Sequence, residues 1–337
     1  MRASVFLLIA AVAGLLSSLS HAELRTDMYG KQVEVPEVIN RVICSSSVVT
    51  YLVYTLDPAL LAGLNSRPNQ AMRSFFTEAT LKKPVVGSFG GARNLVNYEN
   101  ILSVAPDLFL HWPAHNTPNK HEEKLVQMGF PLMALNLSTL EHYPATYRFM
   151  GNLLNRAQRG ATLADYFTKE LDTLKKLRDR IPDAQRVRVY LAEGTDGLLT
   201  VTENSVHSEA IRLAGAINVH TQSSFNLRNK ERISHEQVLL YTPDVILVQD
   251  RHFYASIFKD PRWRQLKAVQ KQKVFLIPDF PFSWIDQPPS FLRLLGAKWL
   301  VHVLYPDLYP TDFQTDIDYF FGLFFEKKAH TAHYMVP

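Results

Sequence analysis

Residues 97–110 read NYENILSVAPDLFL, and residues 234–247 read SHEQVLLYTPDVIL. Both segments have a glutamate at the third position and a Pro-Asp pair at the tenth and eleventh, and apolar residues match apolar residues between them. Self-similarity of this kind indicates two copies of one structural unit. The sequence therefore predicts a chain built from two similar halves.

Each segment carries the local signals of a helix followed by a strand. Asn97 and Ser234 are favoured N-cap residues, a glutamate stands in the next turn, and apolar residues recur at helical spacing until the proline. The apolar runs that follow, 108–110 and 245–248, are short enough for buried strands. A capped helix leading into a buried strand is half of a βαβ unit, so we expect one α/β lobe around each segment.

Strand and helix signals alternate through both halves, which is typical of a parallel sheet covered by helices. Between the halves, residues 147–181 contain no proline, and their apolar side chains stand three and four positions apart. This spacing predicts a long helix or a closely joined pair of helices. We also expect a hairpin over 26–36 that turns at Gly30, and a helix over 288–304.

The first 22 residues have the features of a secretory signal peptide. A positive start is followed by an apolar stretch over 5–16 and by small residues before Glu23. We expect the mature chain to begin near Glu23, with an uncleaved membrane anchor as the alternative. The single cysteine, Cys44, ends an apolar run and is expected to be buried and inert. An exported protein without an internal disulfide fits a bacterial periplasm.

Charge gives little indication of a polyanionic partner. The formal net charge is +4, and much of the charge between residues 156 and 180 alternates in sign, as on a solvated helix face. No basic stripe is interleaved with aromatic residues, which argues against nucleic acid as a partner.

Two further segments carry a family resemblance when they are taken with the repeat. They are TDMYGKQVEVP at 26–36 and WIDQPPS at 284–290. In this order and spacing, the segments resemble the periplasmic substrate-binding proteins of ABC importers for iron-siderophores, cobalamin, haem and related metal chelates. The resemblance implies an α/β fold of two doubly wound, Rossmann-like lobes bridged by one long α-helix. It divides the chain into a signal peptide (1–22), a first lobe (23–146), a bridging helix (147–182) and a second lobe (183–337).

The resemblance also implies partners. The protein would bind a small metal chelate or oxyanion between the lobes and deliver it to an inner-membrane ABC permease, with no cofactor of its own. Glu99 and Glu236 match family positions, one per lobe, that dock onto arginines of the permease. The alternative is structural, because an acidic residue in the first turn of a helix is stabilised by the helix dipole alone, by about 0.3–1 kcal/mol.

Ligands of open α/β sheets bind at the carboxyl ends of the strands, so residues that follow the predicted strands are the ligand-binding candidates. Aromatic rings and arginines among them suit an anionic chelate, although each aromatic ring is as well explained by core packing. The candidates are Ser46, Ser47, Phe89, Arg93, Trp112 and His115 in the first lobe, and Glu193, Asp250, Arg251, Tyr254, Phe282, Trp284 and Asp286 in the second.

The identity of the ligand is left open by the sequence. His111, His115 and His252 could ligate a metal, but no pair has the spacing of a preformed site, so no metal site is predicted. An iron(III)-siderophore is the default, and a nickel or cobalt complex, haem, cobalamin and molybdate are alternatives. A periplasmic hydrolase is a less favoured class because no nucleophile elbow or phosphate loop is present. A structural or adhesive protein would have neither crevice nor ligand.

Overall fold

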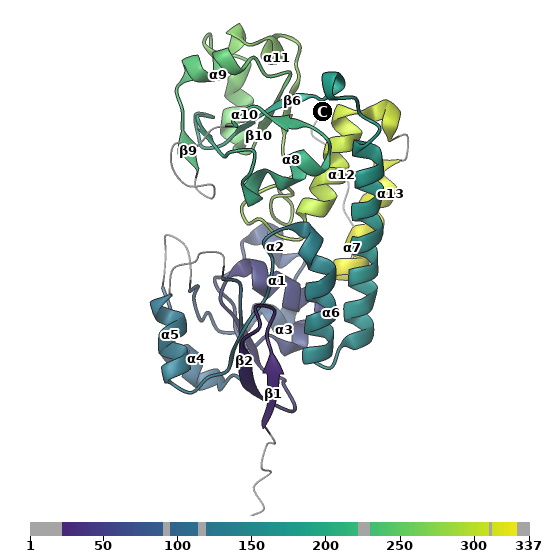
Figure 1. Ribbon diagram of the computed structural model, residues 1–337. Helices are drawn as coiled ribbons and strands as arrows, with labels where there is room; N and C mark the ends of the chain where they lie inside the picture. The colour runs from purple at the N-terminus through teal and green to yellow at the C-terminus, as the bar shows by residue number, and fades with distance from the viewer. Residues whose placement is uncertain (1–21, 90–94, 114–118, 222–229, 310–311, 329–337) are drawn as a thin grey trace, which may run out of the picture.

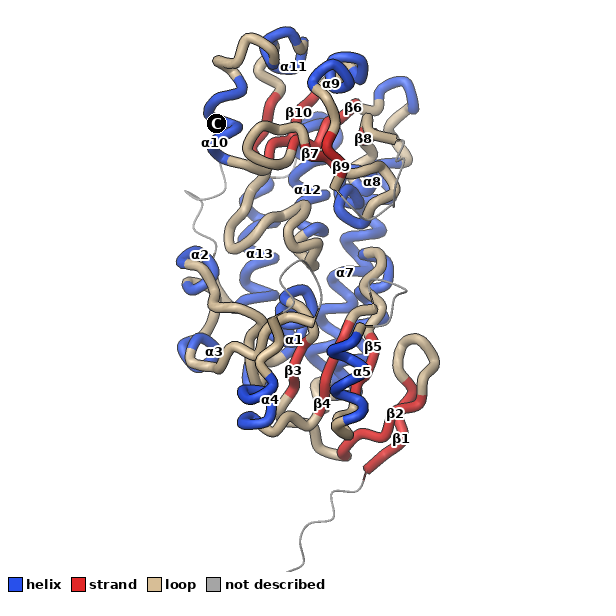
Figure 2. The backbone as a smooth tube through the Cα atoms, turned by 90° about the vertical axis from the view of Figure 1, so that its left-hand side faces the viewer, coloured by secondary structure: helices blue, strands red, loops and turns tan. Residues whose placement is uncertain are grey.

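The computed structural model describes residues 22–89, 95–113, 119–221, 230–309 and 312–328. They form two lobes, one below the other in Figure 1. Figure 2 shows the strands of the two lobes as separate sheets, with loops between them. The predicted α/β class with parallel sheets is confirmed.

The first lobe is built on a parallel sheet of order β3-β4-β5. Leu61 forms a parallel bridge with Val42 on the free side of β3 and so extends the sheet. A separate hairpin, β1–β2, turns at Gly30 with a φ of 85° and confirms the hairpin expected over 26–36. The elements are β1 (Ala22–Thr26), β2 (Gln32–Pro36), β3 (Val42–Cys44), α1 (Ser47–Leu56), α2 (Gln70–Arg73), α3 (Glu78–Leu81), α4 (Tyr98–Val104), β4 (Leu108–His111), α5 (Lys120–Gln127) and β5 (Leu132–Ala134).

The second lobe has a parallel sheet of order β8-β6-β10-β11. Its strands correspond in order to the Leu61 bridge, β3, β4 and β5 of the first lobe, so the two sheets share one strand order. The elements are β6 (Arg188–Ala192), β7 (Leu199–Thr200), α8 (Glu209–Leu213), β8 (Ile217–Asn218), β9 (Glu231–Arg232), α9 (His235–Tyr241), β10 (Val245–Val248), α10 (Arg251–Ile257), α11 (Lys267–Gln270), β11 (Val274–Leu276) and α12 (Arg293–Leu304).

The repeated segments fold as the sequence predicts. Asn97 caps α4 by accepting a hydrogen bond from the N–H of Asn100, and Ser234 caps α9 in the same way from Gln237. Both helices are followed directly by a buried strand, β4 or β10. The expected helix–strand unit is therefore confirmed in both copies.

The aspartate of each Pro-Asp pair fastens the neighbouring strand. Asp107 accepts hydrogen bonds from the backbone N–H groups of Asn40 and Arg41, and from the Arg41 guanidinium at 2.8 Å. Asp244 accepts a hydrogen bond from the N–H of Arg188, at the start of β6, at 3.0 Å. The same residue thus holds the same strand start in each lobe.

The stretch between the lobes is a helical hairpin. It comprises α6 (Tyr143–Leu153) and α7 (Ala157–Arg178), which are separated by a turn at Asn155 with a φ of 55°. Gly151 and Gly160 let the two helices approach, since a Cβ at Gly160 would lie 2.5 Å from the carbonyl oxygen of Tyr147. The long helix expected over 147–182 is thus mainly α7, which runs along both lobes in Figure 1.

The last helix returns to the first lobe. α13 (Phe313–Phe325) places Phe325 5.1 Å from the ring of Phe75, and Phe324 5.8 Å from the ring of Phe167 in α7. Lys298 in α12 pairs with Glu170 of α7 at 2.6 Å and with Asp316 of α13 at 2.5 Å, all three with little exposure. The division at residues 146 and 182 stays a proposal, with α13 as an element shared by both lobes.

The expected start of the helix over 288–304 is wrong, because α12 begins only at Arg293. Pro288 and Pro289 provide no N–H group, and the hydroxyl of Ser290 accepts a hydrogen bond from the N–H of Leu292 instead. Residues 288–292 therefore extend the loop that carries Asp286. Cys44 is buried in β3 as expected, and burial raises the pKa of its thiol to about 12.

Candidate functional site

Segments that follow the carboxyl ends of the two parallel sheets contact each other. β3 leads into α1, and β11 leads into a loop over 277–290. Tyr51 of α1 stacks on Phe282 of that loop, with ring centroids 4.4 Å apart. Because ligands of such sheets bind at the strand ends, the candidate site lies between the strand ends on either side of this contact.

The first lobe contributes hydroxyl and aromatic groups. Ser46 is the half-buried N-cap of α1, and its side chain makes no capping hydrogen bond. Ser47 begins the helix, so the first N–H groups of α1 have no side-chain cap and carry partial positive charge. Trp112 follows β4, is half-buried and packs against the core. The arrangement offers hydrogen-bond donors and one ring to a ligand.

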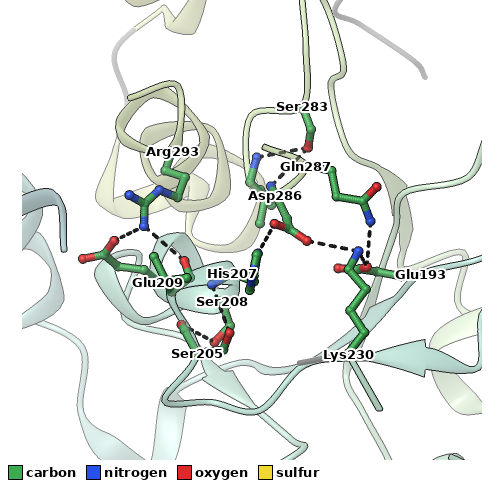
Figure 3. A network of polar contacts seen from close by, with 12 residues as sticks. Glu193, Ser205, His207, Ser208, Glu209, Lys230, Ser283, Asp286, Gln287 and Arg293 are labelled. Carbon is green, nitrogen blue, oxygen red and sulfur yellow. Dashed lines mark hydrogen bonds and ion pairs between the residues drawn. The ribbon is translucent and has the colours of Figure 1, made fainter. Parts of the chain in front are cut away.

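The second lobe contributes a network of buried charges (Figure 3). Glu193 follows β6, and Asp286 lies in the loop after β11; both are fully buried. The Lys230 ammonium forms an ion pair with Glu193 and lies 3.3 Å from the Oδ2 atom of Asp286. Its side chain is 27% exposed, against 1% for each carboxylate. Lys230 is therefore the most exposed of these three side chains.

Two further side chains complete the network. The Nδ1 atom of His207 is hydrogen-bonded to Asp286. Gln287 donates from its amide nitrogen to Glu193 at 3.1 Å and to the amide oxygen of Gln249 at 3.3 Å. Segments that are far apart in the chain thus meet around two carboxylates.

The carboxylates differ in protonation. Burial, together with the charge of Asp286, raises the pKa of Glu193 to about 8, although Lys230 opposes this shift. Burial also disfavours ionisation of Asp286, but the hydrogen bond and charge of His207 and the charge of Lys230 outweigh it and hold that pKa at about 2. Near neutral pH, Glu193 is therefore mostly protonated, and ionised Asp286 balances the charge of Lys230.

Of the predicted residues in the second lobe, the structure brings Glu193 and Asp286 together through the ammonium of Lys230. Asp250 instead caps α10 by accepting a hydrogen bond from the N–H of Phe253 at 2.8 Å. Arg251 forms an exposed ion pair with Asp279.

The predicted aromatic residues lie mainly in packed positions. Phe89 and Trp284 are 1% and 0% exposed, and the Trp284 indole donates a hydrogen bond to the carbonyl of Phe280. Tyr254 packs edge-on against Phe258. Arg93 and His115 lie outside the described residues. Ligand contact by any of these candidates stays a prediction.

Histidines and acidic residues do not gather into a metal site within the described ranges. His111 lies 3.1 Å from Glu122, and His252 is exposed on α10. Lys230, His207, Gln287 and Gln249 are the network residues that the sequence did not single out.

Glu99 and Glu236 occupy the same position in their helices. Both are exposed in the first turn, of α4 and α9 respectively. The backbone N–H of Glu236 and the hydroxyl of Ser234 lower the pKa of the Glu236 carboxylate. In Figure 1, α4 and α9 lie on the side of the molecule opposite α6, α7 and α13. The two carboxylates thus belong to one side of the protein, one per lobe.

Comparison with known proteins agrees with this architecture. The family model described as "Periplasmic binding protein" matches residues 77–280. A solute-binding protein of an ABC transporter from Sulfurospirillum deleyianum superposes with a TM-score of 0.84 at 34% identity, covering 92% of this chain and 97% of that one. The molybdate-binding protein MolA of Haemophilus influenzae is 26% identical over 96% of each chain. A vitamin B12-binding protein of Pectobacterium carotovorum is 29% identical over 45% of this chain and 54% of its own.

The chain belongs to the periplasmic binding protein family, and it is the solute-binding component of an ABC importer. Proteins of this class bind a small ligand and pass it to a membrane permease. Within the described residues, no helix has both the length and the apolar character needed to span a bilayer.

Proposed function

We propose that this protein captures a small oxyanion of the molybdate class between its lobes, with Lys230 as the cationic anchor. The observation that carries the proposal is the Lys230 side chain, which is 27% exposed, whereas the two carboxylates beside its ammonium are each 1% exposed. An ammonium has three N–H donors, and among the described residues that of Lys230 donates a hydrogen bond to Glu193 alone, which leaves donors for a ligand. A rigidly held donor of this kind suits an anion.

The opposite wall suits the same ligand. The start of α1 at Ser46 and Ser47 lies just after the end of β3, and its first N–H groups have no side-chain cap. Helix N-termini favour anions because of the unsatisfied N–H groups and the dipole. A relative that matches 96% of this chain is named for molybdate, whereas vitamin B12-binding relatives match 45% to 63% of it.

An iron(III)-siderophore, the default from sequence, is the second candidate. The half-buried ring of Trp112 after β4 is the observation that favours it, since such a ring could stack on a catecholate or a similar planar group. The two candidates differ in size and in metal, so one experiment separates them.

Elemental analysis and native mass spectrometry of protein purified from the periplasm test the ligand. The metal-free protein is then titrated calorimetrically with sodium molybdate, sodium tungstate and ferric enterobactin. We expect saturable molybdate binding that weakens by about tenfold or more in Lys230→Met and is largely restored in Lys230→Arg. Lys176→Met, at an exposed site on α7, is the matched control and should bind as the unaltered protein does. Tight binding of ferric enterobactin without affinity for molybdate would overturn the oxyanion proposal.

We further propose that Glu99 and Glu236 dock the protein onto the permease. Both are exposed at the start of equivalent helices on one side of the molecule, which suits two carboxylates that meet two cationic sites. Glu99→Ala with Glu236→Ala should leave ligand affinity unchanged and strongly reduce uptake in reconstituted vesicles. Glu78→Ala, at an exposed first-turn site in α3, is the control. Loss of ligand binding in the double variant would assign these residues to the site or the fold instead.

We also propose that residues 1–22 are removed on export, which gives a mature periplasmic chain beginning near Glu23. The intact mass of the purified periplasmic protein tests this directly. A mass that includes the leader would favour the uncleaved anchor.

A further inference from the structure

A second concave site lies at the opposite end of the second lobe. A cavity of about 610 Å³ opens at the amino edge of the sheet, where β6 begins at Arg188 and β10 begins at Val245. Glu193 follows the carboxyl end of β6, so the length of the strand separates this cavity from the ion cluster. The cavity is therefore distinct from the proposed import site.

Apolar side chains line the cavity. Five of them are only partly buried, and they pack against two clusters of buried apolar residues, one of which extends into the first lobe. Apolar surface left open inside a concavity of this size is typical of small-molecule sites. These side chains are Val187, Leu239, Phe275, Val303 and Leu304.

The rim is cationic and lacks counterions. Lys267, Lys271 and Lys273 line the cavity and are exposed, and within the described ranges none of their ammonium groups has an ion pair or hydrogen bond. Asp244 is the one carboxylate of the lining, and it accepts a hydrogen bond from the N–H of Arg188. The Arg188 guanidinium donates to the carbonyl of Tyr241 at 2.9 Å.

This balance leaves an excess of positive charge beside an apolar surface. Lys267 and Lys271 are four residues apart at the helical turn of α11, a spacing at which like charges repel. An anion placed between the lysines would relieve this repulsion, while an attached apolar group would cover the open apolar surface. Both features favour one ligand that carries both groups.

We propose that this cavity binds an anionic amphiphile, with a single carboxylate or sulfonate at the lysine rim and an apolar body the size of a decyl chain or a naphthalene ring against Val303 and Leu304. The site takes its ligand independently of the import site, so it adds a second binding function to the solute-binding protein.

Fluorescence titration of the full chain with anilinonaphthalene sulfonate, and displacement of the dye by decanoate, test the proposal. We expect saturable binding, and displacement by decanoate that is about tenfold more effective than displacement by the uncharged decanol. Lys267→Glu, Lys271→Glu and Lys273→Glu combined should weaken dye binding by about tenfold or more. The matched control reverses Lys169, Lys175 and Lys176 on the exposed face of α7 and should stay within about twofold of the unaltered protein.

A second variant tests the cavity itself. Val303→Trp fills part of the cavity without changing charge, and it should also weaken dye binding while circular dichroism stays unchanged. If the dye binds both variants as it binds the unaltered protein, or if it does not bind saturably, the cavity is not an amphiphile site. Lys230→Met should leave dye binding unchanged, and this separates the outcome from that of the proposed import function.

Discussion

The two lobes share a scaffold and differ at their strand ends. Both repeated helices begin with a capped first turn, and they end in left-handed residues of nearly equal φ, 43° at Ala105 and 44° at Thr242. Asp107 and Asp244 then hold the neighbouring strand. At the carboxyl ends, however, β3 is followed by serines, whereas β6 is followed by a buried glutamate.

This difference separates two kinds of residue. The recurring cap residues and aspartates fasten helices and strands, and their hydrogen bonds stay within one lobe. The residues that differ follow the carboxyl ends of the strands, where a ligand would lie. The repeat thus marks the scaffold, and the departures from it mark the candidate site.

The largest expected change in the free energy of unfolding follows from removing Lys230 in the second lobe. It is compared with the removal of the Ser46 hydroxyl in the first lobe. Lys230→Met leaves the ionised carboxylate of Asp286 without the nearby ammonium and Glu193 without a hydrogen-bond donor, and should lower the free energy of unfolding by about 4 kcal/mol. Ser46→Ala removes a hydroxyl without a capping bond and should change it by less than about 0.5 kcal/mol. Urea denaturation measures both changes. Adding Glu193→Gln to Lys230→Met should recover part of the loss; equal stabilities of the two single variants would contradict the contrast between the lobes.

The second prediction concerns the pH dependence of stability, which should arise from the buried carboxylates of the second lobe. The pKa of Glu193 is raised to about 8 from 4.5, so the folded state binds a proton that the unfolded state releases between these values. Stability should therefore fall as pH rises from about 4.5 to about 8, by about 5 kcal/mol, and then level off.

The pKa of Asp286 is lowered from 3.8 to about 2, so the folded state stays ionised where the unfolded state takes up a proton. Stability should therefore fall as the pH is lowered from about 3.8 towards 2, which is the opposite pH dependence to that of Glu193. Urea midpoints measured across this range give the profile. Glu193→Gln should flatten the fall above pH 4.5, and an unchanged slope in that variant would exclude Glu193 as its source.

Removing Asp107 or Asp244 should lower the free energy of unfolding by a smaller amount, and the loss should differ between the two. Asp107→Ala loses two backbone hydrogen bonds and a guanidinium contact, and should lower the free energy of unfolding by about 2 kcal/mol. Asp244→Ala loses one backbone hydrogen bond and should cost about 1 kcal/mol. Thermal and urea unfolding compare the two. A larger loss from Asp244→Ala would mean that the shared aspartate has different roles in the two lobes.

The smallest expected losses of stability come from removing the two N-caps, and comparing them tests whether the repeated helices are equivalent in the two lobes. Asn97→Ala and Ser234→Ala each remove one N-cap hydrogen bond and should each lower the free energy of unfolding by about 1 kcal/mol. The reciprocal replacements, Asn97→Ser and Ser234→Asn, keep an acceptor and serve as controls. Losses that differ by more than about 1 kcal/mol would show that the two caps are not interchangeable.

The repeated scaffold could be predicted because its signals are local. A cap, a helical spacing, a proline and an apolar run lie within fourteen residues, from 97 to 110 and again from 234 to 247. The turn at Asn155 could not be predicted from the sequence. Its backbone is left-handed, but asparagine also occurs in other conformations and so does not by itself mark a turn. The sequence spacing over 147–181 therefore left one helix and two helices equally open.

The candidate site was predictable only in part. Glu193 and Asp286 were singled out because they follow strands. Lys230, by contrast, meets Glu193 across 37 residues, His207 meets Asp286 across 79, and Gln287 meets Glu193 across 94. No local pattern reports such pairings, because they depend on how the strands are arranged in the sheet.

The return of α13 to the first lobe bears on the order in which the chain can fold. The rings of Phe321 and Phe325 complete packing around Phe75, more than two hundred residues earlier in the sequence. As the polypeptide emerges amino end first, the first lobe must wait for the last helix before its aromatic core is complete.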